Sequence, residues 1–548
     1  MATMATASEI FNKKYTQEEI IPLINQTPII NAMVTLSQFS TEMYREEDFR
    51  RNFAQLFLEN IQTLPTQDIS QELQIQIKND FKKLLPLINQ RIIFSQQSLL
   101  NLWKWLIAFS DEDNIKIEHF GNTNITNLGN LLYHLCMITN DYFFDESKTS
   151  TSDLNAQIFS SAYFNNSENL LSSITRTFII FTEIAADSTL FKEKDFVNIN
   201  EDFESANHYT LKEYISVIFG LLSWYFKSLP LSDISWIQNS ETYFSNSKLN
   251  EISKSIIDSL SISPSELKDW ALNNIDKPWN FMKFKEKPLI ALNETSYLPI
   301  NIKLLHQHFF EGLFHKIRHI YPQNDKSFLD FYGKPFEKYA QNLLDISATN
   351  STLNYSITPE FEYVYKKNTL DSPDIFLKLG NKLLVIEVKS YRLRLQSIIE
   401  SDINTINKDM EKMIIKPLKQ AHDRINELIK INHNVMNGID EVYLMVVTQG
   451  HFPTLAPFER QIRHELNSHF SIPIKDYYHL DIEEFEMLCS LIERKRPIFK
   501  VLNNKSLYHN QNTSFKNFAF ENSYFPKSNK YLSDKFLDVA KEIQRIVF

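Results

Sequence analysis

The chain has 548 residues, of which 43% are hydrophobic and 13% aromatic, so it carries enough apolar surface for several cores, and wholesale disorder is excluded. Its only two cysteines, Cys136 and Cys489, exclude a disulfide scaffold and a multi-cysteine zinc site. The net charge of −10 is uneven: residues 1–280 hold 21 Lys and Arg against 35 Asp and Glu, net −14, and residues 281–548 hold 36 against 32, net +4. Contact with a polyanion is therefore expected in the C-terminal half, the alternative being solvated surface charge.

Several common classes of protein lack support in the sequence. The eight glycines do not fall at the spacing of a P-loop or a dinucleotide fingerprint, which argues against ATP or NAD binding by those routes. The start has no basic head followed by a long apolar run, so no signal peptide is expected. The densest apolar stretch, Tyr214 to Phe226, is 13 residues long and too short to span a bilayer. We expect a soluble cytoplasmic protein that does not contact membranes.

Residues 1–280 are predicted to be almost wholly helical. Helix starts are marked by capping boxes, in which a hydroxyl side chain and an acid three residues later satisfy backbone amides reciprocally. These pairs are Thr16 with Glu19, Thr210 with Glu213, and Ser263 with Glu266. No chemical motif appears in this region, so a sensing, scaffolding or partner-binding role is expected, with a protein partner or an activating ligand.

Residues 281–325 are predicted to form a strand, a turn and one aromatic-rich helix over residues 302–320. Glu311, His315 and His319 share a face of this helix at spacings of four, a pattern that metal ligands can adopt. No further acid or cysteine stands at motif spacing, so a structural role is favoured.

The strongest chemical signal lies between residues 326 and 395. A helix containing Glu337 precedes three predicted strands, with Asp374 opening the middle strand and Glu387 and Lys389 near the end of the last. Gly380-Asn381 predicts a two-residue hairpin turn. Pairing residues 379 and 382 and counting outward places Asp374 directly opposite Glu387.

Alternation along the strand puts Glu387 and Lys389 on one face. Two acids and a lysine at the end of an apolar strand are costly to bury unless they are paired or hold a cation. Carboxylates around a small hard cation suit Mg²⁺, with Mn²⁺ as a substitute. The sequence therefore predicts a divalent-metal site.

Pro373-Asp374 followed by Glu387-Val388-Lys389 resembles the signature of the PD-(D/E)xK phosphodiesterase (restriction-endonuclease-like) superfamily. The resemblance covers residues 326 to about 497. It implies an α/β domain with a mixed central sheet in the order α-β-β-β-α-β, completed here by a helix over 416–430, a strand over 441–450 and later elements. The fold class expected for the whole chain is mixed, with an α-helical N-terminal region and this α/β domain.

The resemblance also implies roles for individual residues. Asp374 and Glu387 would ligate Mg²⁺, with the Val388 carbonyl as a third ligand. Lys389 would orient or deprotonate the attacking water, and Glu337 would bind a second ion or orient the first shell. Gln420 matches the glutamine that some members place beside the site. The alternatives are an ordinary surface acid for Glu337 and a polar core contact for Gln420.

Basic residues surround the predicted site. Arg392 and Arg394 alternate after Lys389, which predicts a shared face that meets phosphates. A stripe of lysines recurs at helical spacing: Lys408, Lys412, Lys416 and Lys419. We predict that this stripe contacts nucleic acid, the alternative being that it is solvated helix surface. Residues 498–548 form a tail that ends in a helix.

Together these features predict a Mg²⁺-dependent endonuclease that hydrolyses nucleic acid, DNA rather than RNA, with a setting in prokaryotic antiviral defence suggested by analogy. A homo-oligomer would be compatible with the sequence. One alternative is a catalytically inactive, nuclease-like DNA-binding or scaffold protein. Another is that the N-terminal half is the functional core and the C-terminal half only dimerises.

Overall fold

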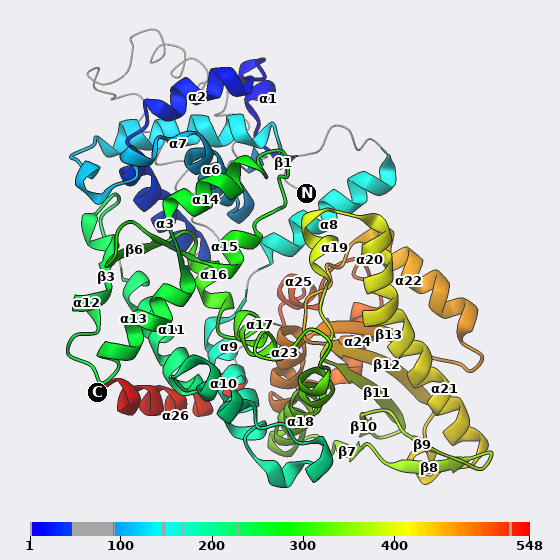
Figure 1. The fold of residues 1–548 in the computed structure, drawn as a ribbon. Helices are drawn as coiled ribbons and strands as arrows, with labels where there is room; N and C mark the ends of the chain where they lie inside the picture. The colour runs from blue at the N-terminus through cyan, green and yellow to red at the C-terminus, as the bar shows by residue number, and fades with distance from the viewer. Residues whose placement is uncertain are drawn as a thin grey trace.

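The computed structural model describes residues 3–45, 91–92, 94–143, 150–166, 168–227, 229–524 and 529–548. Most helices from the N-terminal half lie together on one side of the molecule, and the largest sheet lies on the other (Figure 1). The helix α8 (Thr151–Asn165) is an exception, because it lies on the side of the sheet and packs in the core of that region. Within the described residues no single helix is long and apolar enough to cross a membrane; the helices Gln17–Asn25 and Ile29–Thr41 meet that test only as a pair, with a bend of 100° between them.

The first half of the chain is built mainly from helices. All three capping boxes form as predicted, at the starts of α2, α11 and α14. The helices are α1 (Ala7–Phe11), α2 (Gln17–Asn25), α3 (Ile29–Arg45), α6 (Gln96–Phe109), α7 (Ile125–Asn140), α8 (Thr151–Asn165), α9 (Leu170–Thr177), α10 (Ile199–Asn207), α11 (Leu211–Tyr225), α12 (Ser240–Tyr243), α13 (Asn250–Leu260), α14 (Pro264–Leu272) and α15 (Met282–Glu286), and a π-helical segment, Phe178–Ile184, continues α9.

A small mixed sheet joins this half to the next. Its strand order is β3-β6-β5-β4, from β3 (Gln238–Asn239), β4 (Ser261–Ile262), β5 (Leu289–Ala291) and β6 (Ser296–Pro299). The prediction that residues 1–280 are almost wholly helical is confirmed in outline, because the strands described there, β1 (Thr3–Met4), β2 (Arg91–Ile92), β3 and β4, have only two residues each. The predicted helix over 302–320 is two helices, α16 (Ile302–Gln307) and α17 (Glu311–Arg318). They are separated at His308, whose ring is held by Tyr214 and by the Lys285 carbonyl.

The second half contains a five-stranded mixed sheet in the order β13-β12-β11-β10-β7. The strands β7, β10 and β11 are antiparallel neighbours, whereas β11, β12 and β13 are parallel. Three strands were expected between residues 356 and 389, but there are five, because a separate hairpin, β8–β9, is inserted between β7 and β10. The strands are β7 (Ser356–Pro359), β8 (Glu362–Tyr365), β9 (Asn368–Asp371), β10 (Ile375–Leu379), β11 (Lys382–Lys389), β12 (Glu441–Thr448) and β13 (Asp476–Asp481).

Helices cover both faces of this sheet. Successive residues of β11 enter different cores: Leu384 and Ile386 pack in the core shared with α18 (Ser327–Asn350) and α23 (Ile482–Glu493), and Leu383 and Val385 pack in a second core. The second core is formed with α20 (Ile403–Met410), α21 (Lys416–Lys430) and α22 (Ala456–His469), and a π-helical segment, Glu411–Ile415, links α20 to α21. The sheet is thus the middle of three layers, as its apolar central strands predict.

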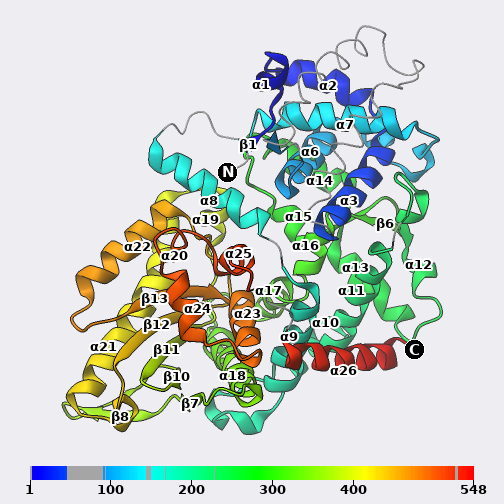
Figure 2. The same cartoon turned by 180° about the vertical axis from the view of Figure 1, so that it is seen from behind.

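The last helices connect the sheet to the N-terminal half. After α19 (Leu395–Ile399) and the elements above come α24 (Ile498–Lys505), α25 (Phe515–Glu521) and α26 (Lys530–Val547). Figure 2 shows α24 beside the sheet and α26 beneath the helices of the first half. The helix α26 packs on α9 and α11, and one apolar core runs from Ala5 to Ile543.

Candidate active site

The hairpin β10–β11 forms with the predicted register. Leu379 pairs with Lys382 and Ile375 with Ile386, so continuing by one residue sets Asp374 opposite Glu387. Gly380 has a φ of +62°, while Asn381 is not among the residues with positive φ; a turn that needs positive φ at its first central position suits glycine there. The strand β10 begins at Ile375, so Asp374 lies one residue before it.

The side chains of Asp374, Glu387 and Lys389 converge at the end of β11. Lys389 Nζ lies 2.7 Å from Glu387 Oε2 and 3.2 Å from Asp374 Oδ2. The Val388 N–H donates to Asp374 Oδ2 at 2.6 Å, which fixes the carboxylate on the neighbouring strand. The side chains of Glu387, Asp374 and Lys389 are only 2%, 14% and 20% exposed, so these ion pairs are largely shielded from solvent.

Burial and neighbouring negative charge shift the pKa values of Glu387 and Lys389. Burial, together with the Asp374 carboxylate, raises the pKa of Glu387 to about 7, although Lys389 opposes the shift. Burial lowers the pKa of Lys389, but the carboxylates of Asp374 and Glu387 outweigh it, and the pKa lies above its ordinary value. The lysine therefore stays charged at neutral pH, and the acids form a site that gains from an added cation.

Glu337 belongs to the same electrostatic group although it comes from α18. Burial and the Asp374 carboxylate raise the pKa of Glu337 to about 8. The helix passes close to the end of β11 at Gly333, where a Cβ would lie 3.7 Å from Ser390 Oγ and 3.8 Å from Glu337 Oε1. The sequence placed Glu337 on a helix before the strands, and the structure brings it near Asp374.

One acid of this group, Glu360, was missed in the sequence. Pro359 pairs with Ile375, so continuing this register by one residue sets Glu360 opposite Asp374 on the side away from Glu387. Burial and the Asp374 carboxylate raise the pKa of Glu360. Its signal was an acid directly after a short strand, and finding it would have required separating β7 from the β8–β9 hairpin. Three acids thus stand in a row across β7, β10 and β11.

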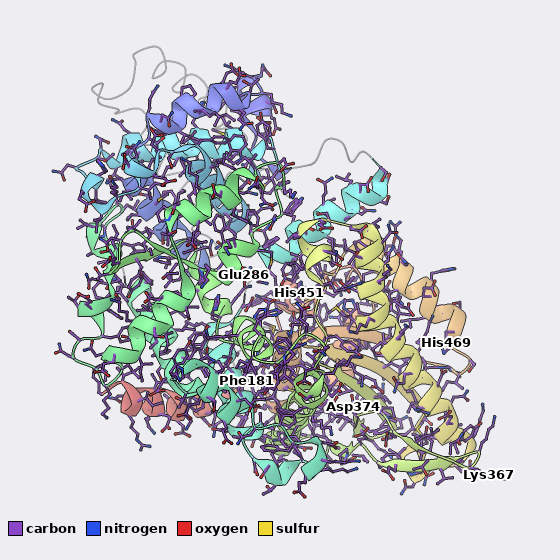
Figure 3. The ribbon with its side chains drawn as sticks, viewed as in Figure 1. Phe181, Glu286, Lys367, Asp374, His451 and His469 are labelled. Carbon is purple, nitrogen blue, oxygen red and sulfur yellow. The ribbon has the colours of Figure 1, made fainter. Side chains whose placement is uncertain are left out.

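The loop that carries Asp374 is braced by Ser372. The Ser372 N–H donates to the Phe361 carbonyl at 2.9 Å, and the Phe361 N–H donates to Ser372 Oγ at 3.0 Å. The adjoining β8–β9 hairpin turns at Lys366 and Lys367, and Figure 3 shows Lys367 at its tip, away from Asp374. The loop is therefore held in place while the hairpin tip projects beyond the site.

The basic residues do not form the surface that the sequence predicted. Because β11 ends at Lys389, Arg392 and Arg394 do not share a strand face. Arg392 stacks on Phe314 of α17, whereas Arg394 pairs with Asp409 of α20 at 2.6 Å. The predicted shared strand face was wrong, whereas contact of Arg392 and Arg394 with phosphate stays a prediction.

The lysine stripe is partly engaged within the protein. Lys408, Lys412 and Lys416 are exposed, with the Lys412 ammonium 4.4 Å from the centre of the Tyr391 ring. Lys419 pairs with Glu465 at 3.3 Å. Contact with nucleic acid stays a prediction for these residues. So does the role of Gln420, which is exposed on α21 rather than being a polar core contact.

A second group with metal-ligand atoms, His422, Asp423 and His469, lies between α21 and the end of α22. His422 Nε2 accepts the Ser471 N–H at 3.0 Å, so its Nδ1 carries the proton and donates to Asp423 Oδ1 at 3.0 Å. A neutral imidazole in this state has no lone pair left for a metal. Among the predicted helical ligands, Glu311 pairs with Lys285 at 2.8 Å, in keeping with a structural role.

The group at the end of β11 is consequently the better candidate for a metal. Asp374, Glu387 and Glu337 offer hard oxygen donors, which is the ligand type that Mg²⁺ prefers. Burial and the Asp374 carboxylate raise the pKa values of Glu337 and Glu387, so an added cation would stabilise the charged forms of both acids. The Val388 carbonyl stays a predicted ligand. Comparison with protein families, with curated proteins and with solved structures finds no match for this chain.

Proposed function

We propose that the protein is a Mg²⁺-dependent nuclease that hydrolyses phosphodiester bonds in DNA. The observation that carries the proposal is the convergence of Asp374, Glu387 and Lys389 at the end of a buried strand. Lys389 Nζ lies within 3.2 Å of a carboxylate oxygen of each acid. The order α18, β7, β10, β11, α21, β12 supports a restriction-endonuclease-like domain of the PD-(D/E)xK type, with the β8–β9 hairpin as an insertion.

In this proposal the residues have separate tasks. Asp374 and Glu387 would hold Mg²⁺, and Glu337 would hold a second ion or orient the first shell. A bound divalent ion lowers the pKa of water and polarises a phosphoryl oxygen. Lys389 stays protonated because its pKa is raised, so it would orient the water and offset charge on the phosphate rather than act as a base.

The reaction that follows is a simple hydrolysis. The water oxygen forms a bond to phosphorus, the bond from phosphorus to the 3′ oxygen breaks, and the departing oxygen takes up a proton. The products are a 5′-phosphate and a 3′-hydroxyl end. The mildly basic C-terminal half, net +4 over residues 281–548, supports a polyanionic substrate. Prokaryotic antiviral defence remains the setting suggested by analogy.

The test is cleavage of plasmid DNA, single-stranded DNA and RNA by the full chain with Mg²⁺ and with EDTA. We expect Mg²⁺-dependent cleavage of DNA that Asp374→Asn and Lys389→Met abolish. Lys382→Met is the matched control, because Lys382 lies on the same strand but pairs with Glu441 at a half-exposed position. Equal cutting by all four proteins would indicate a contaminant, and RNA cleavage alone would correct the substrate.

The second candidate is a nuclease-like protein that binds DNA without cutting it. It would be favoured if the wild type bound DNA with Mg²⁺ but left every substrate intact, and if Asp374→Asn left that binding unchanged. The presence of all three residues of the signature argues for the enzyme.

A further inference from the structure

A polar cavity lies where the two halves of the chain meet. The enclosed space is small, about 70 Å³, and its walls come from five parts of the chain: Tyr163 to Arg176, Gln307 to Glu311, and the residues at or just after the ends of β11, β12 and β13. Figure 3 shows His451, one of its lining residues, between the helical half and the sheet. A space of this size suits one small anionic group, such as a phosphate or a carboxylate, rather than a whole drug-sized ligand.

Arg392 is the most unusual group in this cavity. Its guanidinium carbon lies 3.1 Å from the centre of the Phe314 ring, and one of its terminal nitrogens donates to Gln449 Oε1 at 2.8 Å. Within the described part of the chain it has no carboxylate partner, and the buried atoms Arg392 Nε and Gln449 Nε2 have no acceptor. Burial lowers the pKa of Arg392 to about 10, so the side chain still carries its charge at neutral pH.

The acids that line the cavity are already engaged. Glu311 pairs with Lys285 at 2.8 Å, Asp481 with His451 at 2.7 Å, and Glu483 with Arg176 at 3.4 Å, while Glu168 accepts a hydrogen bond from Gln307 at 2.6 Å. Burial raises the pKa of Glu483 to about 8, so much of this acid is protonated at neutral pH. The Tyr332 hydroxyl and the Glu311 carboxylate oppose the lowering of the Arg392 pKa by burial, but within the described residues no carboxylate forms an ion pair with Arg392.

We propose that this junction cavity binds a small molecule through a phosphate or carboxylate group held by Arg392 and Gln449. A partly buried cation without an ion-pair partner is costly, and a guanidinium presents paired N–H donors that match an oxyanion. The neighbouring Gly450 permits the arrangement, because a Cβ there would lie only 2.9 Å from Arg392 Cα.

The cavity adjoins both elements that carry the candidate active site. The Gln449 N–H donates to the Lys389 carbonyl at 3.2 Å. On the other side, Arg176 donates to Glu486 at 2.7 Å, and Glu486 also accepts from Tyr339, two residues after Glu337 on α18. A ligand bound by Arg176 or Arg392 would therefore influence the positions of Lys389 and Glu337. Its binding does not depend on the proposed nuclease activity.

The test is calorimetric titration of the full chain, in EDTA, with inorganic phosphate, adenosine 5′-monophosphate and citrate, supported by thermal melting. We expect saturable binding of at least one probe to the wild type. Arg392→Met should weaken it about tenfold or more, because a charge-assisted hydrogen-bond pair is lost. Arg392→Lys, which keeps the charge but loses the paired donors, should bind with intermediate affinity. Arg460→Met, which removes an exposed arginine outside the cavity, should bind like the wild type.

The outcomes separate this proposal from the nuclease. Asp374→Asn should lose cleavage and keep full affinity for the probe, and preference for phosphate over citrate would identify the class of ligand. The proposal is overturned if none of the probes binds at millimolar concentration, or if a folded Arg392→Lys or Arg392→Met protein binds as tightly as the Arg460→Met control.

Discussion

Replacing Lys389 by methionine tests the geometry of the active site without requiring catalysis. The substitution keeps the length of the side chain but removes the ammonium that lies 2.7 Å from Glu387 and 3.2 Å from Asp374. Two shielded carboxylates are then left without their cation. Lys382→Met removes a lysine from the other end of β11, where the pair with Glu441 is 30% exposed on both sides, and serves as the matched control.

The two substitutions should differ strongly in stability. Removing one partner of a buried ion pair costs about 3–5 kcal/mol, whereas an exposed pair contributes about 0–1 kcal/mol. Lys389 is 20% exposed, so the lower end, about 3 kcal/mol, is the better expectation. For a domain of the size of the sheet region this corresponds to a fall of about 6–12 °C in melting temperature, against about 4 °C or less for the control.

The stability lost in Lys389→Met should depend on pH. Without Lys389, the pKa of Glu387 should rise further above its unfolded value, so the folded state binds more protons and gains stability as the pH falls. The deficit of Lys389→Met should therefore be largest at pH 8 and shrink toward pH 5. Millimolar Mg²⁺ should stabilise this variant more than Lys382→Met. Equal melting temperatures for the two variants, or a deficit that grows at pH 5, would refute the reasoning.

Three further predictions use thermal melting at fixed protein concentration. Arg176→Met should destabilise the fold by about 3–5 kcal/mol, because it leaves Glu486 buried without its cation, 2.7 Å away in the wild type; a loss below about 1 kcal/mol would contradict this. Gly450→Ala should cost about 1–3 kcal/mol, since its Cβ would press on the Arg392 backbone, and an unchanged melting temperature would show that the loop adapts. Burial lowers the pKa of His308 to about 4, so stability should fall as the pH drops from 6.5 toward 4, by about 3 kcal/mol for this residue, and His308→Gln should flatten that slope.

Local sequence signals account for much of the active-site hairpin. Gly380 allows the positive φ of the turn, and the apolar run of β11 fixes which residues alternate, so the pairing of residues 379 and 382 and the position of Asp374 follow. Whether these side chains hold a metal and cut nucleic acid is not decided by that register. Those two statements stay predictions.

Contacts between distant parts of the chain account for what the sequence did not reveal. Arg392 was expected to share a strand face with Arg394, but it lies against Phe314 from a helix that precedes it by more than seventy residues. The break at His308 depends in the same way on Tyr214. Glu360 was missed because pairing β7 with β10 requires an insertion to be recognised as a separate hairpin. Periodicity does not encode such contacts.

The position of α26 has a consequence for synthesis on the ribosome. This helix buries Leu532, Val539 and Ile543 and packs on α9 and α11, which precede it by more than three hundred residues. The apolar side chains of those helices that α26 covers stay exposed until the whole sheet region has been translated. A chain that is released before α26 is made would keep this apolar surface exposed and would be prone to aggregate.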